Sequence, residues 1–128
     1  MKLRIVDDSL RLRLTRSEVA SIERGLAVES SVHFPGGPAL TYSLVVADTN
    51  RISASLDAAT IEVLLPRAVA LPWAAGNDVS LHGEQPLEHG VLRILVEKDF
   101  TCVEPRDGED QSDLYPNPAT AQITVPER

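Results

Sequence analysis

The sequence of 128 residues contains a single cysteine, Cys102. A lone cysteine excludes an internal disulfide, so a packed core has to stabilise the fold, and this length is sufficient for one. No apolar run approaches the ~20 residues of a membrane-spanning helix. The first residues also lack the apolar stretch of about 7–15 residues that a secretion signal requires. We therefore expect a cytoplasmic protein with no membrane partner.

Motifs of catalysis are also missing. The chain has no glycine-rich phosphate loop and no G-x-S-x-G turn, and its three histidines, His33, His82 and His89, are scattered. This pattern predicts no catalytic residue, no cofactor and a non-catalytic protein. Metal binding through the acidic C-terminal segment is an alternative, because Cys102 lies near Asp107 and Glu109. However, no C-x-x-C, H-E-x-x-H or EF-hand spacing is present, so we predict no specific metal site.

Charge is distributed unevenly along a chain whose formal net charge is -7. The positive charges of residues 1–16 outnumber the negative ones, whereas residues 97–113 are strongly acidic. An overall acidic chain argues against a generic nucleic-acid binder, because affinity for phosphates comes from excess lysine and arginine. The cations near the N-terminus are Lys2, Arg4, Arg11, Arg13 and Arg16, and the acidic residues that we expect to dock against them from the C-terminal tail are Asp107, Glu109, Asp110 and Asp113.

Alternation of apolar and charged residues predicts a β-hairpin over residues 2–14. A two-residue turn at 7–8 or a four-residue turn over 6–9 keeps the apolar residues on one face, whereas an odd loop would mix the faces. Either turn sets Arg4 opposite Arg11 and Lys2 opposite Arg13. Since like charges directly opposite one another are unfavourable, we expect this face to meet an anion or an acidic segment.

Two short helices are expected, one after each of two hairpins. Thr15 and Glu18 have the spacing of a capping box, and Gly25 ends this first helix. Pro66 suits the first position of the second helix, and Gly76 is expected to end it in the left-handed conformation. The other predicted strands cover residues 28–34, 40–47, 52–57, 60–65, 79–83 and 90–97.

The chain matches itself at an offset of 51 residues without a gap, so that Leu14 falls on Leu65, Gly25 on Gly76 and Leu44 on Leu95. We interpret residues 2–46 and 53–97 as two ββαββ halves. The predicted fold is mainly β (β-rich α+β), with both halves forming one pseudo-two-fold barrel. A single β-barrel domain would cover residues 1–98, and residues 99–128 would form an irregular, acidic, proline-rich extension.

The second half resembles the swapped-hairpin domain of AbrB-like regulators and MazE-type antitoxins. The resemblance rests on Leu65-Pro66-Arg67, Gly76-Asn77-Asp78-Val79 and Leu92-Arg93-Ile94. In that family two chains interleave into one barrel, so tandem copies imply a single-chain pseudo-dimer. The first half departs from the pattern, because Thr15 replaces the proline. The chain as a whole also resembles small uncharacterised bacterial proteins that end in a tail like Lys98–Phe100, Glu109–Asp113 and Tyr115–Pro118, a likeness that implies no activity.

The AbrB-like resemblance implies DNA binding by arginines near the first hairpin and the helix start, where Arg4, Arg11, Arg13 and Arg16 lie. The matching positions of the second half are Ser55, Glu62, Leu64 and Arg67, so three of the four cations are missing there. A two-fold basic surface for a palindromic DNA site is therefore not expected.

We favour a binding or regulatory module, a monomer or weak dimer, whose basic first hairpin meets an unknown protein or anionic partner. A second hypothesis places the acidic segment 97–113 of the chain itself on this face. An AbrB-like DNA-binding regulator is the third.

Overall fold

The structure, a computed structural model, describes residues 1–100 and 112–116. Within these residues the chain is mainly β with two short helices, as predicted. None of its helices has the length and apolarity needed to cross a membrane, as far as the described residues go. The elements in chain order are β1 (Lys2–Ile5), β2 (Ser9–Leu14), α1 (Arg16–Glu23), β3 (Val28–Val32), β4 (Leu40–Ala47), β5 (Ser53–Asp57), β6 (Thr60–Pro66), α2 (Arg67–Ala75), β7 (Ser80–Pro86) and β8 (Val91–Lys98).

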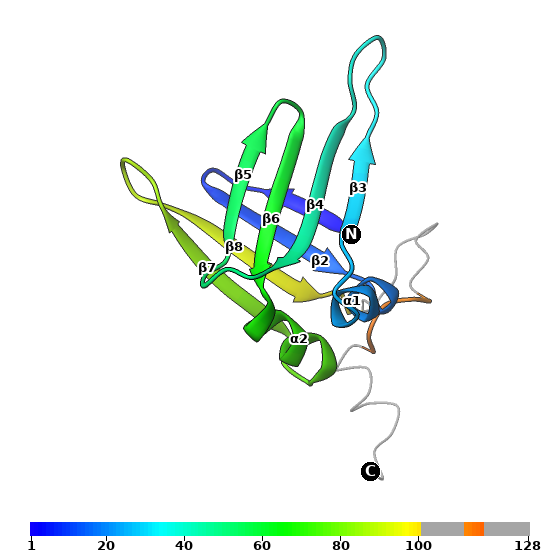
Figure 1. Cartoon of the computed structure of the whole chain (residues 1–128). Helices are drawn as coiled ribbons and strands as arrows, with labels where there is room; N and C mark the ends of the chain where they lie inside the picture. The colour runs from blue at the N-terminus through cyan, green and yellow to red at the C-terminus, as the bar shows by residue number, and fades with distance from the viewer. Residues whose placement is uncertain (101–111, 117–128) are drawn as a thin grey trace.

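The strands form two four-stranded sheets, and each sheet combines one hairpin from either half of the chain (Figure 1). The first sheet has the order β1-β2-β8-β7, and the second has the order β3-β4-β6-β5. Hairpin partners are antiparallel, whereas the two central pairs, β2 with β8 and β4 with β6, are parallel. The first and last strands of the chain therefore lie in the same sheet.

The β1–β2 hairpin has the predicted register, with Lys2 opposite Arg13 and Arg4 opposite Arg11. The turn is the two-residue one. The Val6 N–H donates to the Ser9 carbonyl at 3.2 Å, and Asp7 adopts the positive φ of 47° that such a tight turn requires. Like charges do lie opposite one another on the outward face of this hairpin.

The predicted capping box of α1 is confirmed. The Glu18 N–H donates to the Thr15 hydroxyl at 3.3 Å, and the Thr15 N–H donates to the Glu18 carboxylate at 2.9 Å. The Glu18 carboxylate also accepts from the N-terminal ammonium of Met1 at 2.6 Å. One side chain therefore fixes both the start of α1 and the start of the chain.

Two details of α2 differ from the prediction. Pro66 ends β6 and occupies the N-cap of α2 rather than its first helical position. Gly76 ends α2 as predicted, but its φ of -101° and ψ of -160° are extended, not left-handed. Glycine is needed there for space, because a Cβ atom would lie 2.8 Å from the Pro72 carbonyl oxygen.

The core lies between the inner faces of the two sheets and continues under the helices. α1 and α2 pack against each other where strands β2 and β6 lead into them (Figure 1). Trp73 of α2 is the largest fully buried side chain. The core consists of Leu10, Leu12, Leu14, Val19, Ile22, Val28, Leu44, Val46, Ile52, Val63, Leu65, Ala70, Trp73, Ile94 and Val96.

The gap-free match between the halves is wrong in the last strand. It pairs Leu44 with Leu95, but Leu44 is completely buried whereas Leu95 lies between the buried Ile94 and Val96 and is only half-buried. Because a slip of one residue turns every side chain of a strand to the opposite face, β8 is out of phase with β4 by one residue in that alignment. Leu95 therefore points outward.

The chain after β8 returns to α1. Within residues 112–116, Tyr115 forms a parallel bridge with Phe100, and their rings are tilted against each other at 5.6 Å. The side chain of Leu114 is buried. The tail residues Asp107, Glu109 and Asp110 lie outside the described residues.

Candidate functional site

The outer face of the first sheet carries four of the five predicted cations, Lys2, Arg4, Arg11 and Arg13. Alternate residues of a strand point to opposite faces, so the residues that alternate with the buried side chains of β2 and β8 all lie on this face. Its cations, called the basic surface from here on, are Lys2, Arg4, Arg11, Arg13 and Arg93.

One carboxylate, that of Glu97 on β8, holds two of these arginines. Nε of Arg11 and Nε of Arg13 each lie 2.7 Å from the same oxygen, Oε1 of Glu97. The Glu97 side chain is 12% exposed, whereas the arginine side chains are 34% and 39% exposed. One negative charge therefore faces two positive ones, and each guanidinium keeps N–H donors beyond the Nε that Glu97 uses.

Glu97 remains ionised at neutral pH in this setting. Partial burial raises the pKa of Glu97, but the hydrogen bonds and charges of Arg11 and Arg13 outweigh burial and hold the pKa below its ordinary value of 4.5. The carboxylate thus orients both guanidinium groups without neutralising the pair.

Lys2 and Arg4, on the edge strand β1, differ in their partners. Nζ of Lys2 lies 3.1 Å from Oδ2 of Asp99, whose side chain is almost fully buried. Arg4 is exposed and forms no side-chain hydrogen bond or ion pair with any described residue. Two acidic residues at the end of β8, Glu97 and Asp99, therefore contact the cations of the first hairpin. Arg4 stands beside Arg11 without such a contact.

Arg16 is not on this face. Its guanidinium lies 5.9 Å from the centre of the Tyr115 ring, and its backbone N–H donates to the Asp113 carbonyl at 2.8 Å. The Asp113 carboxylate accepts from the Ser17 N–H at 3.2 Å. Of the predicted tail-docking residues, Asp113 thus contacts the start of α1, and the basic surface lies on another part of the fold.

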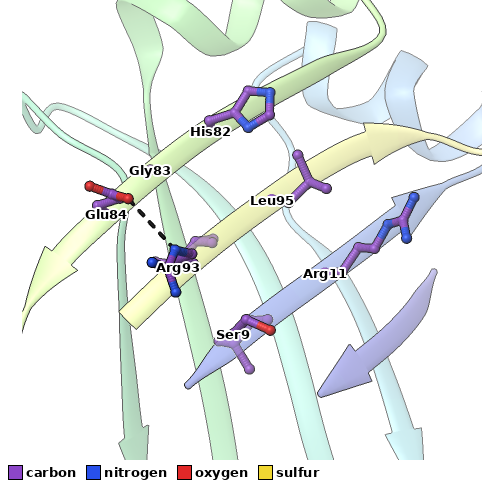
Figure 2. Close-up of a pocket in the computed structure, with 9 residues that line it drawn as sticks. Ser9, Arg11, His82, Gly83, Glu84, Arg93 and Leu95 are labelled. Carbon is purple, nitrogen blue, oxygen red and sulfur yellow. Dashed lines mark ion pairs between the residues drawn. The ribbon is translucent and has the colours of Figure 1, made fainter. Parts of the chain in front are cut away.

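Three residues that were not predicted to belong to a site, His82, Arg93 and Leu95, also lie on this face. They surround a shallow hollow of about 290 Å³ on the outer face of the first sheet (Figure 2). Strand pairing sets Leu95 beside Arg11 on one side and beside His82 on the other. Arg93 and Glu84 form an ion pair at 3.8 Å at the rim, drawn as the dashed line in Figure 2.

A signal for Leu95 was present in the sequence. The residues two positions before and after it, Arg93 and Glu97, are charged and mark the outward face of the strand, whereas Ile94 and Val96 mark the inward one. The gap-free repeat match set Leu95 on Leu44, a residue that the structure buries, and so did not use this signal. Its neighbours on β2 and β7 follow from strand pairing, which periodicity alone does not give.

The described residues offer little to hold a metal ion or to activate a nucleophile. They contain no group of three or more histidine, cysteine, aspartate or glutamate side chains with the proximity of metal ligands. Cys102, considered above as part of a metal site, lies outside them. Ser80 Oγ and His82 Nε2 are 3.2 Å apart on β7, but this contact is exposed to solvent, and no carboxylate in the described part of the chain orients the imidazole.

The surface therefore presents orientated N–H donors beside the apolar side chain of Leu95, and such donors form strong hydrogen bonds with carboxylate and phosphate groups. No curated protein and no solved structure matches the chain. A family model described as "Family of unknown function (DUF7009)" matches residues 1–119, in agreement with the second resemblance found in the sequence. The chain belongs to this family of unknown function, DUF7009.

Proposed function

We propose that this protein is a non-catalytic binding module that takes an anionic segment of a partner protein on its basic surface. The observation that carries the proposal is the sharing of one Glu97 oxygen by Arg11 and Arg13. A structural ion pair needs one arginine for one carboxylate. The second arginine leaves a positive charge that an external carboxylate or phosphate is suited to balance.

The charge of the whole face supports the proposal. Among the described residues, the five cations of this face outnumber the three carboxylates that pair with them, those of Glu84, Glu97 and Asp99, on a chain with a net charge of -7. The outer face of the second sheet carries Glu29, Asp57 and Glu62 instead. The excess is therefore local and lies on one side of the fold, as expected of a surface that recognises and orients a charged partner.

Rigidity adds to the affinity that this surface is able to provide. Arg11 and Arg13 stand on β2, which is paired on both sides, by β1 and by β8. Their guanidinium groups are already held by Glu97. Binding therefore costs less side-chain entropy than it would with freely moving arginines, because part of the ordering has occurred during folding.

The proposal also includes a duplicated swapped-hairpin origin for the fold. Three features support it. In both sheets the hairpin strands that lead into the helices, β2 and β6, pair in parallel with the last strand of the other hairpin, β8 and β4. The helices begin at Arg16 and Arg67, which are 51 residues apart, and the pairing of Ser53 with Leu64 is the pairing of Lys2 with Arg13 shifted by the same 51 residues.

An AbrB-like DNA-binding function is a weaker candidate. The second half has Ser55, Glu62 and Leu64 where the first half has arginines, so only one half offers a basic hairpin. We place this module in the cytoplasm.

Fluorescence anisotropy tests the proposal with two labelled probes, a polyglutamate peptide and a random DNA duplex, each titrated at low and at high salt. We expect the peptide to bind and the Arg11→Ala/Arg13→Ala variant to lose about tenfold or more in affinity. Arg24→Ala/Arg51→Ala is the matched control. It removes the same charge from two exposed positions outside the basic surface and should leave affinity unchanged.

A second variant separates binding from folding. Arg4→Ala removes a cation that has no partner among the described residues, so it should weaken peptide binding without lowering the melting temperature. Equal affinity of wild type and both surface variants would contradict the proposal. Tight binding of the duplex with a steep salt dependence that is lost in Arg11→Ala/Arg13→Ala would favour the DNA-binding alternative.

A further inference from the structure

Leu95 is an apolar side chain in the middle of a charged surface. It stands on the central strand β8, with Arg11 beside it on β2 and His82 beside it on β7. Along its own strand, Arg93 precedes it and Glu97 follows it on the same face. On the solvent-facing side of a sheet, such a position is usually polar. Here, the outward-facing Leu95 lines the hollow shown in Figure 2, together with Leu10 of β2 and Ile94 of β8.

The size of the hollow indicates what it can hold. Its volume of about 290 Å³ is at the lower limit of small-molecule cavities, which enclose about 300–1,000 Å³, and it is open to solvent on the outer face of a sheet. An open hollow does not enclose a small molecule on most sides. It does fit one apolar side chain that projects from a larger partner lying across the sheet.

The rim of the hollow is able to accept a carboxylate. Arg93 and Glu84 are 3.8 Å apart, and their side chains are 69% and 65% exposed, so their attraction is weak and screened by water. Arg11, on the other side of Leu95, shares its carboxylate with Arg13. An incoming acidic group therefore meets two guanidinium groups, those of Arg93 and Arg11, that have N–H donors free for a further hydrogen bond beyond their contacts with Glu84 and Glu97.

We infer that Leu95 anchors one apolar side chain of an acidic, extended segment of a partner protein, with a carboxylate of that segment two residues away bound by Arg93. This inference rests on the function proposed above and names the sequence pattern of the partner, acidic-x-apolar. The spacing follows from strand geometry: residues i and i+2 of an extended chain project from the same side about 6.5 Å apart, which is the spacing of Arg93 and Leu95 along β8. The charge of the basic surface selects an acidic partner, and Leu95 determines how the partner segment is aligned along β8.

The test uses two labelled peptides that differ at one position, Ser-Glu-Ser-Glu-Ser-Leu-Ser-Glu-Ser and the same peptide with alanine in place of leucine. We expect the leucine peptide to bind the full-length protein at least about fivefold more tightly, since burying the larger side chain adds apolar contact. In Leu95→Ala this advantage should disappear. In Arg11→Ala/Arg13→Ala both peptides should weaken by the same factor, because the apolar contact is retained.

The outcomes separate the inference from the proposed function. Equal affinity of the two peptides for wild-type protein would overturn the role of Leu95 and leave the basic surface supported. Failure of both peptides to bind would overturn the two together. Since the peptide comparison uses unmodified protein, it decides the question even if Leu95→Ala were to fold poorly.

Discussion

Arg13 of β2 and Glu97 of β8 are register partners in the parallel pair, and Nε of Arg13 donates to Oε1 of Glu97 at 2.7 Å. Arg11 donates to the same oxygen from the next outward position of β2. The contact joins residues 84 positions apart in the chain and links the first hairpin to the last strand. It is therefore both a part of the fold and the centre of the proposed binding surface.

Replacing Glu97 by glutamine should separate these two roles. We expect the free energy of unfolding to fall by about 1–2 kcal/mol, because two hydrogen bonds in a partly buried position lose the negative charge of their acceptor. Affinity for polyglutamate should rise at the same time, since the surface gains a net positive charge. Urea unfolding and anisotropy measure the two effects. Glu84→Gln, which alters a largely exposed pair, is the control and should change stability by less than about 0.5 kcal/mol.

The contribution of Glu97 should depend on pH in a defined direction. Its pKa in the folded protein lies below the ordinary value of 4.5, so the unfolded chain takes up the proton first as pH falls. The stabilisation is therefore complete above about pH 5 and is lost as pH falls through the folded-state pKa. The measurement is urea unfolding of wild type and Glu97→Gln between pH 7 and pH 3, at about one-unit intervals. A stability difference that stays constant over this range would show that the charge of Glu97 is not what stabilises the contact.

Gly83 should tolerate no side chain. It lies on β7 between the outward His82 and Glu84, and a Cβ atom placed on it would lie 2.7 Å from the Cβ of Ile52. We expect Gly83→Ala to destabilise the protein by about 1–3 kcal/mol through overpacking. Gly37→Ala is the matched control, since nothing lies within 4 Å of the position that its methyl group would take, and thermal unfolding compares the two. An unchanged melting temperature in Gly83→Ala would mean that β7 moves easily away from Ile52.

Asp113 should hold residues 112–116 against the start of α1. Its carbonyl accepts from the Arg16 N–H and its carboxylate from the Ser17 N–H, so it satisfies two of the N–H groups that a helix start leaves without intrahelical partners. Asp113→Ala should speed hydrogen exchange at Ser17, whereas Asp113→Asn, which keeps an acceptor oxygen, should do so less. Asp8→Ala, in the β1–β2 turn, is a control of equal charge change. If all three variants exchange as wild type does, the carboxylate does not contribute to this contact.

Local features were predictable because they depend on residues close in the chain. The capping box of Thr15 and Glu18 needs only a spacing of three residues, and the pairing of Arg4 with Arg11 follows from alternation across a tight turn. The left-handed conformation expected at Gly76 was wrong, because the residue is extended and ends α2 close to the carbonyl of Pro72, four residues earlier in the same helix.

The sequence by itself determined the mainly β fold, the register of the first hairpin and the row of outward cations on it, because apolar periodicity and turn chemistry act over a few residues. Only the tertiary structure decided that β8 lies parallel to β2. That pairing brings Glu97 to Arg11 and Arg13 and turns Leu95 toward the same surface. The physical reason is that strand partners distant in the chain are selected by the burial of the whole inner face, and a shift of one residue along β8 would exchange Leu95 with the core residues beside it.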